Sequence, residues 1–364
     1  MTSRNIRISI LLAAFVCTPS LSGENVADAC TVMRFSFDGR IVVARNHDWG
    51  FGEGLVVVNP RGIQKQAISP VQPAKWVSTY GSVSFVQFGR EIPFAGMNEQ
   101  GLTVDLLQLI QAEFPVIQPG KHSVNVVQWV QYQLDTAATV ADVVISLEKI
   151  YPTPMVPSIE RVHYFVTDAS GDVATIEFLD GNPHVHRGNE IQDCALANST
   201  CIDSREAFHN QQWRNNSERR YYQAVCQVQM ANEEVTPADS IEYARQSLSK
   251  VAQPGLTQWS IVYEPAEKRI SFSTRVAKEL RTLDLDDLDF DPASDAMTVD
   301  IDKDVAGDLM PYLKKYTASD NARIVNFAFD RTMPKSFVRT AVKQLVLNYP
   351  ATLSVVGESA AVGE

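Results

Sequence analysis

The sequence has few cysteines and histidines, and their spacing matches no common metal site. Its 364 residues include five cysteines and six histidines, with no C-x-x-C pair. His184 and His186 could share one strand face, but no carboxylate or third ligand of fitting spacing accompanies them, which favours a solvated strand. We therefore expect no metal and no cofactor.

Long apolar runs and basic blocks are also lacking. After residue 29, no stretch approaches the roughly 20 apolar residues that cross a bilayer. The formal net charge is −11, and an acidic chain without a basic block argues against nucleic acid and anionic membranes as partners. These absences favour a soluble protein without a membrane span.

Residues 1–29 have the features of a secretory leader. Two arginines precede a short apolar segment, residues 8–17, and small residues follow it. The A-x-A pattern of residues 27–29 predicts a cut that leaves Cys30 first, whereas an earlier cut would leave a short pro-peptide. An N-terminal anchor helix is the alternative. We expect a secreted or periplasmic protein.

The remaining residues, 30–364, are expected to form a single domain. The sequence has no internal repeat and no low-complexity linker. The one shift in composition is the acidic stretch 283–295, which is either a loop or a weak boundary. We expect a C-terminal extension from about residue 283, which could add a strand, contact a partner subunit or do neither.

Strand signals dominate the first part of this domain. An Asp-Gly pair at residues 38 and 39 separates two alternating runs, which is a strong hairpin signal. Four further extended runs between residues 54 and 109 predict an antiparallel meander. The segments 162–181 and 257–274 each predict a later hairpin.

Apolar residues recur at helical spacing in two pairs of segments. Ser123 is expected to cap a helix over 124–137, and Thr139 a helix over 140–151, with Asp142 completing a capping-box pattern. The second pair comprises residues 216–231 and 237–249. Strand blocks that alternate with helix pairs predict an α+β fold, in which two antiparallel sheets face each other with helices outside.

Four cysteines remain after the expected leader: Cys30, Cys194, Cys201 and Cys226. If Cys30 is kept for chemistry, at most one disulfide fits among the other three. Cys194 and Cys201 would close a small loop, and such a bridge is common in exported proteins.

A cysteine exposed by cleavage can use its own α-amine, with a pKa of about 7.7–8.0, as general base. It also needs a cation that favours the thiolate and an acceptor for the amine. Arg45 and Asp48 end the strand expected to pair with that of Cys30, although such a pair is also common on ordinary surfaces. A lipid anchor on Cys30 is an alternative, but Ala27 stands where a lipobox has Leu. A purely structural role for Cys30 is the third interpretation.

Several segments, taken in order, resemble the choloylglycine hydrolase family, which includes bile salt hydrolases and penicillin V acylases. They are Cys30 itself, DGRIVVARNHDW, GMNEQGL, WVQYQLDTAATVADVV, DASGDVATIEFLDG and ALANST. The resemblance extends from Cys30 to about Thr274. It implies an N-terminal nucleophile hydrolase with a four-layer αββα sandwich.

The resemblance also implies roles for single residues. Cys30 matches the nucleophile, Arg45 the arginine beside the thiol, and Asp48 the aspartate near the α-amine. Asn198 matches an asparagine of the oxyanion hole. Arg220 matches a second active-site arginine, although another arginine directly precedes it.

Two features depart from the family. Gln108 stands where the family carries Asn, Tyr or Trp, a position that partly reads the substrate and whose backbone N–H joins the oxyanion hole. The long insertion of bile salt hydrolases between Asn198 and Arg220, often involved in tetramer assembly, is absent. This absence argues against the family's usual quaternary structure, and a homo-oligomer of another kind stays an alternative.

The sequence thus predicts hydrolysis of a small-molecule N-acyl amide through a Cys30 thioester. Apolar residues near strand ends indicate an acyl pocket, with Trp49 and Gln108 as substrate contacts. The leader and the shortened insertion resemble the Gram-negative branch, which favours penicillin V or N-acyl-homoserine lactones over conjugated bile salts. An exported binding protein or lipoprotein without catalysis is the alternative from another class.

Overall fold

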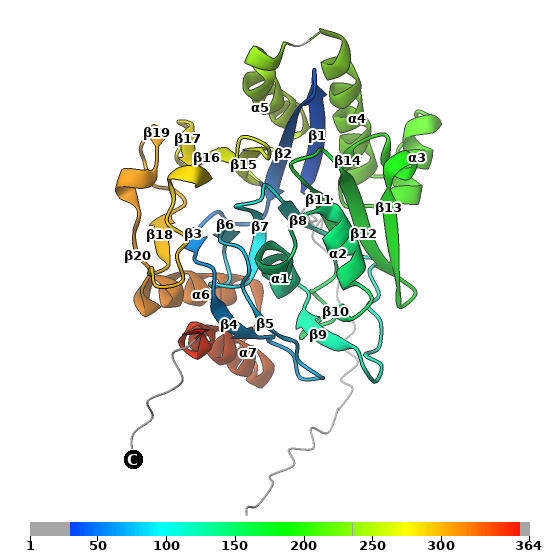
Figure 1. Ribbon diagram of the computed structural model, residues 1–364. Coiled ribbons are helices and arrows are strands. Elements are labelled where there is room, and N and C mark those ends of the chain that lie inside the picture. Colours follow the sequence, from blue (N-terminus) through cyan, green and yellow to red (C-terminus); the bar gives the residue numbers. More distant parts are fainter. Residues whose placement is uncertain (1–29, 235, 357–364) are drawn as a thin grey trace, which may run out of the picture.

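Two large sheets dominate the computed structural model, which describes residues 30–234 and 236–356 (Figure 1). The seven-stranded sheet contains, in spatial order, β14 (Ala195–Leu196), β1 (Thr31–Phe37), β2 (Arg40–Asp48), β15 (Thr257–Glu264), β16 (Arg269–Thr274), β17 (Arg281–Asp284) and β19 (Gly307–Asp308). The nine-stranded sheet contains β13 (Asn182–Arg187), β12 (Val173–Leu179), β11 (Val162–Thr167), β8 (Thr103–Gln108), β7 (Pro93–Asn98), β6 (Ser82–Val86), β3 (Leu55–Asn59), β18 (Met297–Asp300) and β20 (Lys314–Lys315). Within these two sheets, every pair is antiparallel except β17 with β19.

Smaller elements complete the chain. Two small sheets pair β9 (His122–Asn125) with β10 (Ile150–Thr153), and β4 (Ile63–Gln66) with β5 (Lys75–Val77) and β21 (Ser354–Val355). The α-helices are α1 (Gln128–Thr136), α2 (Val140–Ser146), α3 (Cys201–His209), α4 (Asn216–Glu234), α5 (Ser240–Val251), α6 (Ala318–Thr332) and α7 (Phe337–Asn348). Among the described helices, none is long and apolar enough to cross a membrane.

Each face of the two sheets is buried by a different partner, which produces four layers. Phe85 and Trp259 belong to the core between the sheets. Phe35 of β1 packs with residues of α4 and α5, and Trp129 of α1 packs with Tyr164 of β11 on the opposite outer face. The predicted αββα arrangement of an α+β fold is therefore confirmed.

The expected hairpins are present, and the first of them determines the position of Cys30. Asp38 and Gly39 both have positive φ, 50° and 87°, as a tight hairpin turn requires. The turn sets a register in which Thr31 faces Asn46 and Val32 faces Arg45. The end of β2 therefore lies beside the residue that precedes β1.

The segment after residue 283 joins the sheets and covers one of their faces. β18 pairs with β3, and α6 and α7 pack below the sheet in Figure 1. Because side chains alternate along a strand, Val56 and Val58 of β3 face the other sheet, while Leu55 and Val57 belong to the cluster formed with α6 and α7. The tail therefore buries an apolar surface that would otherwise face solvent.

The first helix starts later than its sequence pattern predicts. Ser123 lies in strand β9, where its Oγ is 2.6 Å from Ser69 Oγ, so it caps no helix. Asn125 Oδ1 instead accepts from the backbone N–H groups of Val127 and Gln128. Val124 and Asn125 belong to β9, which pairs with β10, and α1 therefore begins only at Gln128.

Other helix predictions were partly right. Thr139 caps α2 with the expected capping box, but the helix ends at Ser146 instead of residue 151. The residues at 237–239 form a short 3-10 turn, and α5 begins at Ser240. Helices α3, α6 and α7 were not expected.

The predicted disulfide is wrong, since Cys194 and Cys201 are free thiols. Cys194 Sγ points at the carbonyl of Ile191, 3.4 Å away. Cys201 begins α3 and is buried beside Glu177, so the two thiols lie in different environments.

Candidate functional site

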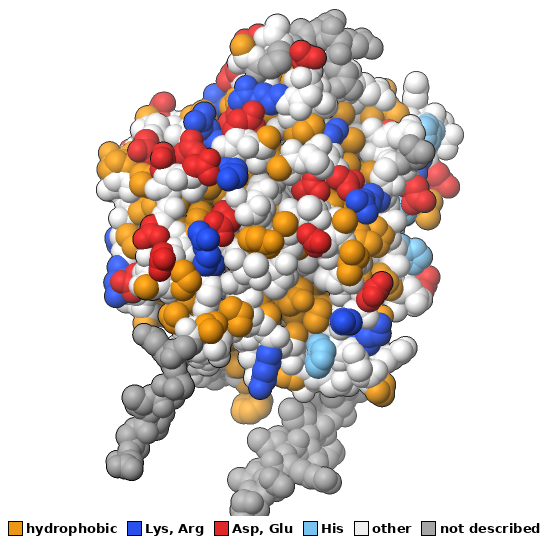
Figure 2. Space-filling view, in the orientation of Figure 1, with side chains coloured by type: hydrophobic (Ala, Val, Ile, Leu, Met, Phe, Trp, Pro, Cys, Tyr) orange, Lys and Arg blue, Asp and Glu red, His pale blue; other side chains and the backbone are white. Residues whose placement is uncertain are grey.

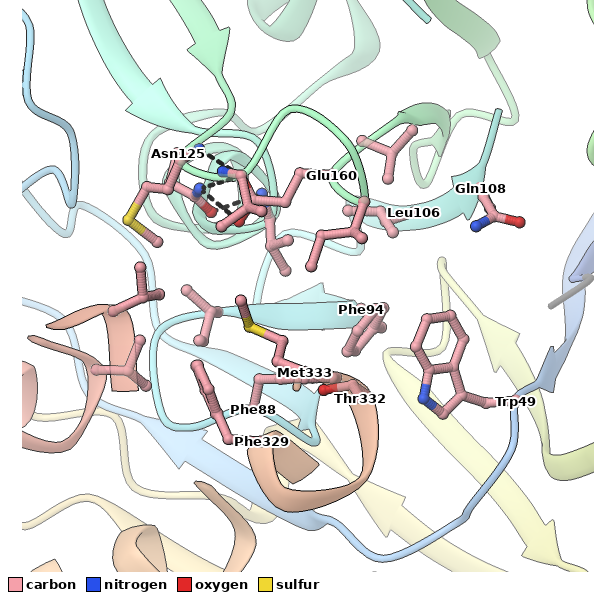
Figure 3. A pocket seen from close by; sticks show the side chains of 18 of the residues that line it. Trp49, Phe88, Phe94, Leu106, Gln108, Asn125, Glu160, Phe329, Thr332 and Met333 are labelled. Carbon is pink, nitrogen blue, oxygen red and sulfur yellow. Dashed lines mark hydrogen bonds between the residues drawn. The ribbon is translucent and has the colours of Figure 1, made fainter. Parts of the chain in front are cut away.

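Cys30 lines a cavity of about 610 Å³. The thiol is free and buried, and it lies next to the seven-stranded sheet at the start of β1. Trp49 and Gln108, the two expected substrate contacts, line the same cavity and stand at one end of it in Figure 3. The structure therefore brings these three predicted residues together.

Arg45 connects the thiol to the opposite sheet. Its Nη2 lies 3.7 Å from Cys30 Sγ and 3.2 Å from the carbonyl of Leu106, and its Nη1 donates to the carbonyl of Phe94 at 2.6 Å. The Asp105 carboxylate is 3.3 Å from Nη1. Burial opposes the charge on Arg45, but Asp105 and Cys30 outweigh it and raise the pKa. A permanent cation is thus fixed beside the thiol.

His47 is a neighbour of the thiol that the sequence reading missed. Its Nδ1 is 4.0 Å from Cys30 Sγ, its Nε2 is 3.1 Å from Gln87 Oε1, and its ring stacks on Trp259 with centroids 4.2 Å apart. Burial and the charge of Arg45 lower the pKa of His47 to about 3. His47 lies two positions after Arg45 on one strand, so the alternation of β2 could have revealed it.

Asp48 lies on the other face of β2 from Arg45. Its carboxylate accepts from Thr257 Oγ1 at 2.5 Å and Gln253 Nε2 at 3.0 Å. Burial raises the pKa of Asp48, against these hydrogen bonds. Its charge in turn acts to raise the pKa of the Cys30 thiol.

Arg220 contacts Cys30 from helix α4 and links it to Asn198. Its Nη1 donates to the carbonyl of Cys30 at 2.6 Å, and its Nη2 donates to Asn198 Oδ1 at 2.8 Å. Asn198 Nδ2 donates to the carbonyl of Gln108 at 2.8 Å. The adjacent Arg219 is exposed and bonds to Asn216, so the structure brings the second of the two arginines to Cys30.

Opposing effects act on the Cys30 thiol. Burial is the largest and raises its pKa, whereas Arg45, Arg220 and a hydrogen bond from the Asp48 backbone lower it. The net pKa is above the ordinary value of a cysteine. A thiol in this position is therefore protonated near neutral pH and needs a base before it can attack.

Beyond Trp49 and Gln108, the cavity is mainly apolar. Phe88, Phe94 and Phe329 form one wall, facing Leu106 and Glu160 across the space (Figure 3). Glu160 accepts from the backbone N–H groups of Met155 and Val156 in its own loop and from Asn125 of β9, so its carboxylate already has hydrogen-bond donors. Charged residues of both signs are scattered over the face of the molecule seen in Figure 2.

One cluster away from this cavity could hold a metal ion. Donor atoms of Glu177, His186 and Cys201 lie within 4.8 Å of one another, so His186 does have the partners that its sequence neighbourhood lacked. His184 is exposed, as expected for a solvated strand residue. Glu177 is also hydrogen-bonded to His163 Nδ1 at 3.1 Å and to the backbone N–H of Cys201 at 3.0 Å. These hydrogen bonds lower the pKa of Glu177 to about 2, against the effect of burial.

Comparison with known proteins agrees with this geometry. A family model described as linear amide C-N hydrolases, choloylglycine hydrolase family, matches residues 30–229. A penicillin V acylase of Pectobacterium atrosepticum is 31% identical over 221 residues, which cover 56% of this chain and 58% of that protein. The match therefore spans little more than half the length of this relative.

Solved structures show the same fold. The penicillin V acylase of Agrobacterium tumefaciens superposes with a TM-score of 0.68 at 24% identity, covering 79% of this chain and 98% of that one. A variant of the conjugated bile acid hydrolase of Clostridium perfringens gives a TM-score of 0.61 at 13% identity, covering 76% and 98%. With the family match over residues 30–229, the chain belongs to the choloylglycine hydrolase family of linear amide C-N hydrolases.

Proposed function

We propose that this protein hydrolyses a linear N-acyl amide, with Cys30 as an N-terminal nucleophile. The observation that carries the proposal is the position of Cys30. Its thiol lines an apolar cavity and lies 3.7 Å from a buried arginine, while a second buried arginine binds its carbonyl. An acyl chain can occupy such a cavity while its carbonyl meets the thiol.

In the proposed reaction, the α-amine created by cleavage before Cys30 takes the thiol proton. Sγ then bonds to the substrate carbonyl carbon, and the carbonyl oxygen becomes an oxyanion. Asn198 and a backbone N–H near Gln108 would stabilise this charge, an effect of about 2.7–4 kcal/mol per donor. The C–N bond breaks as the leaving amine takes the proton, and water then cleaves the thioester to release the acid.

Three other residues near the thiol serve this step indirectly in the proposal. Arg45 favours the thiolate because its charge is fixed beside Sγ. Asp48 orients the α-amine, and Arg220 holds both the Cys30 carbonyl and Asn198. His47 is neutral above a pH of about 3 and so adds no positive charge at the thiol.

The substrate we favour is penicillin V or an N-acyl-homoserine lactone, and hydrolysis of the latter would interrupt quorum signalling. The matched protein of Pectobacterium atrosepticum is a penicillin V acylase, which supports this choice. Conjugated bile salts are the second candidate, because a bile acid hydrolase shares the fold.

The proposal requires export and removal of residues 1–29, since the α-amine of Cys30 is otherwise part of a peptide bond. Those residues lie outside the described part of the chain. Intact mass and N-terminal sequencing of the secreted or periplasmic protein should give Cys30 as residue one. An uncleaved leader, or a diacylglyceryl group on Cys30, would instead favour the non-catalytic binding protein or lipoprotein.

The activity itself is tested with a panel of amides. We expect release of the free amine from penicillin V or from short and long acyl-homoserine lactones to exceed release from glycocholate. No hydrolysis of any of these by the correctly processed protein would contradict the proposal.

A further inference from the structure

The two C-terminal helices form part of the cavity that contains the thiol. Phe329 and Met333, at the end of α6, and Val342 and Val346, on α7, all line it. These residues lie outside the family match, which ends at residue 229. The helix pair is therefore a feature that the family match does not account for.

The helix pair is held firmly against the sheet. Phe329 and Val346 are buried in one cluster with Leu55, Val57 and Val86 of the nine-stranded sheet. Phe329 also packs edge-on against Phe88, with ring centroids 5.9 Å apart. A wall built in this way has a set position, so it can limit the length of what enters the cavity.

The chemistry of this wall suits a hydrocarbon chain. Its lining side chains are aliphatic, aromatic or thioether, apart from Thr332 and Arg331. Arg331 is exposed, with its guanidinium over the ring of Phe327 at 4.3 Å. On the facing side, the carboxylate of Glu160 is occupied by backbone N–H groups. A polar or charged acyl group would lose water here without gaining partners.

We propose that α6 and α7 form the far end of an acyl-binding site, and that they select N-acyl amides with a flexible, unbranched aliphatic chain of limited length. This inference rests on the proposed function, because the thiol must attack the carbonyl at the near end. Figure 3 shows the two ends: Trp49 and Gln108 on one side, Phe88 and Phe329 farther along. Each added methylene that stays within the cavity is expected to improve binding about fourfold.

The test uses a homologous series of straight-chain N-acyl-homoserine lactones, from butanoyl to tetradecanoyl, with penicillin V and glycocholate for comparison. For the wild type, kcat/KM should rise with chain length and then level off or fall where the chain meets α7. Val342→Trp and Met333→Trp, both at half-buried wall positions, should move that maximum to shorter chains and lower the long-to-short ratio at least tenfold.

Leu345→Trp is the matched control, since Leu345 lies on α7 but is 46% exposed and does not line the cavity. Its chain-length profile should equal that of the wild type. Identical profiles for all three variants, or a clear preference of the wild type for glycocholate, would overturn the inference. If one tryptophan variant fails to fold, the other still decides the question.

A binding measurement separates this inference from the proposed function. Titration of Cys30→Ala with free fatty acids of increasing length, followed by calorimetry, needs no catalysis. Binding that strengthens with length in Cys30→Ala and weakens on adding Val342→Trp supports the acyl site even if no amide is hydrolysed. Hydrolysis without any effect of chain length on binding would reject the acyl site and leave the hydrolase proposal standing.

Discussion

The two ends of the cavity differ in the interactions that hold their side chains in place. At the thiol end, Cys30 is surrounded by buried Arg45, His47 and Arg220, each held by hydrogen bonds of 2.6–3.4 Å. At the helix end, formed by α6 and α7, Phe329 and Val346 are held by packing alone within an apolar cluster. Polar geometry at the first end must be kept for the chemistry, whereas the second end can change shape with little chemical consequence.

The residues of the two ends also come from different parts of the sequence. Cys30 and the three side chains around it lie within the family match at residues 30–229, whereas Thr257 and Gln253, which donate to Asp48, lie beyond it. The helix end comes from residues beyond it. The predictions below test whether the two ends are as separate in function as they are along the chain.

The largest effect is expected for Cys30→Ala at the thiol end. Loss of the nucleophile should lower kcat for amide hydrolysis by at least about 10⁴-fold, because no other group can form the thioester. Circular dichroism and thermal unfolding should stay close to the wild type. Cys226→Ala removes a free thiol outside the cavity and should keep full activity; wild-type turnover by Cys30→Ala would refute the mechanism.

Asn198→Ala is expected to lower kcat by about 10²–10³-fold, since it removes a proposed oxyanion donor. KM should change much less, because the donor acts mainly on the transition state. Asn182→Ala, on an exposed strand position, serves as the control with no change in kcat. An equal loss in both variants, or a change confined to KM, would speak against the assigned role.

His47 should make the folded state sensitive to acid. Its folded pKa of about 3 lies below the ordinary 6.5, so the unfolded chain binds more protons between these pH values. Folding stability is therefore lost as pH falls through this window, by up to about 1.4 kcal/mol per pH unit. Asp105, whose pKa burial raises to about 6, acts in the opposite direction below pH 6 and masks the trend in the wild type.

The comparison of His47→Gln with the wild type isolates this effect, because Asp105 is present in both. Chemical denaturation from pH 7 to 4 should show the variant gaining stability relative to the wild type as pH falls. His184→Gln, at an exposed histidine, should show no such trend. A constant difference across the pH range would mean that folding does not lower the pKa of His47.

The smallest effect is expected at the helix end. Ile324→Val in the cluster beneath α6 should lower the free energy of unfolding by about 0.5–1.5 kcal/mol. Hydrolysis should be unchanged, because Ile324 does not line the cavity. Ile202→Val, which is 60% exposed, should have almost no effect. A large loss of activity without loss of stability would show that the two ends are coupled.

Much of the thiol end could be anticipated from local sequence. The Asp-Gly turn fixes the β1–β2 register, and that register alone brings Arg45 opposite Val32, next to Cys30. The roles of Arg220 and Asn198 were predicted from the family resemblance, which extends over much of the chain. His47 was not predicted, although it shares a strand face with Arg45. Only the two charged residues of the segment ARNHDW, Arg45 and Asp48, were considered as neighbours of the thiol.

The helix end could not be anticipated in the same way. Helices α6 and α7 have amphipathic sequences, but nothing in their periodicity says which sheet face they cover. Val342 approaches the cavity only because β3 and β6 leave an apolar surface that α7 fills. Glu177, His186 and Cys201 likewise meet from separate segments, 24 residues apart in the case of Glu177 and Cys201.

The sequence by itself determined the cysteine behind a leader-like segment, the hairpin registers and the layered order of strands and helices. These depend on local chemistry: turn residues, alternation and caps within a few positions of each other. Only the tertiary structure decided which side chains surround the thiol, that the cysteines stay unpaired, and that the C-terminal helices close the cavity. Those outcomes depend on contacts between distant segments, whose free energy is set by packing and burial that no single segment contains.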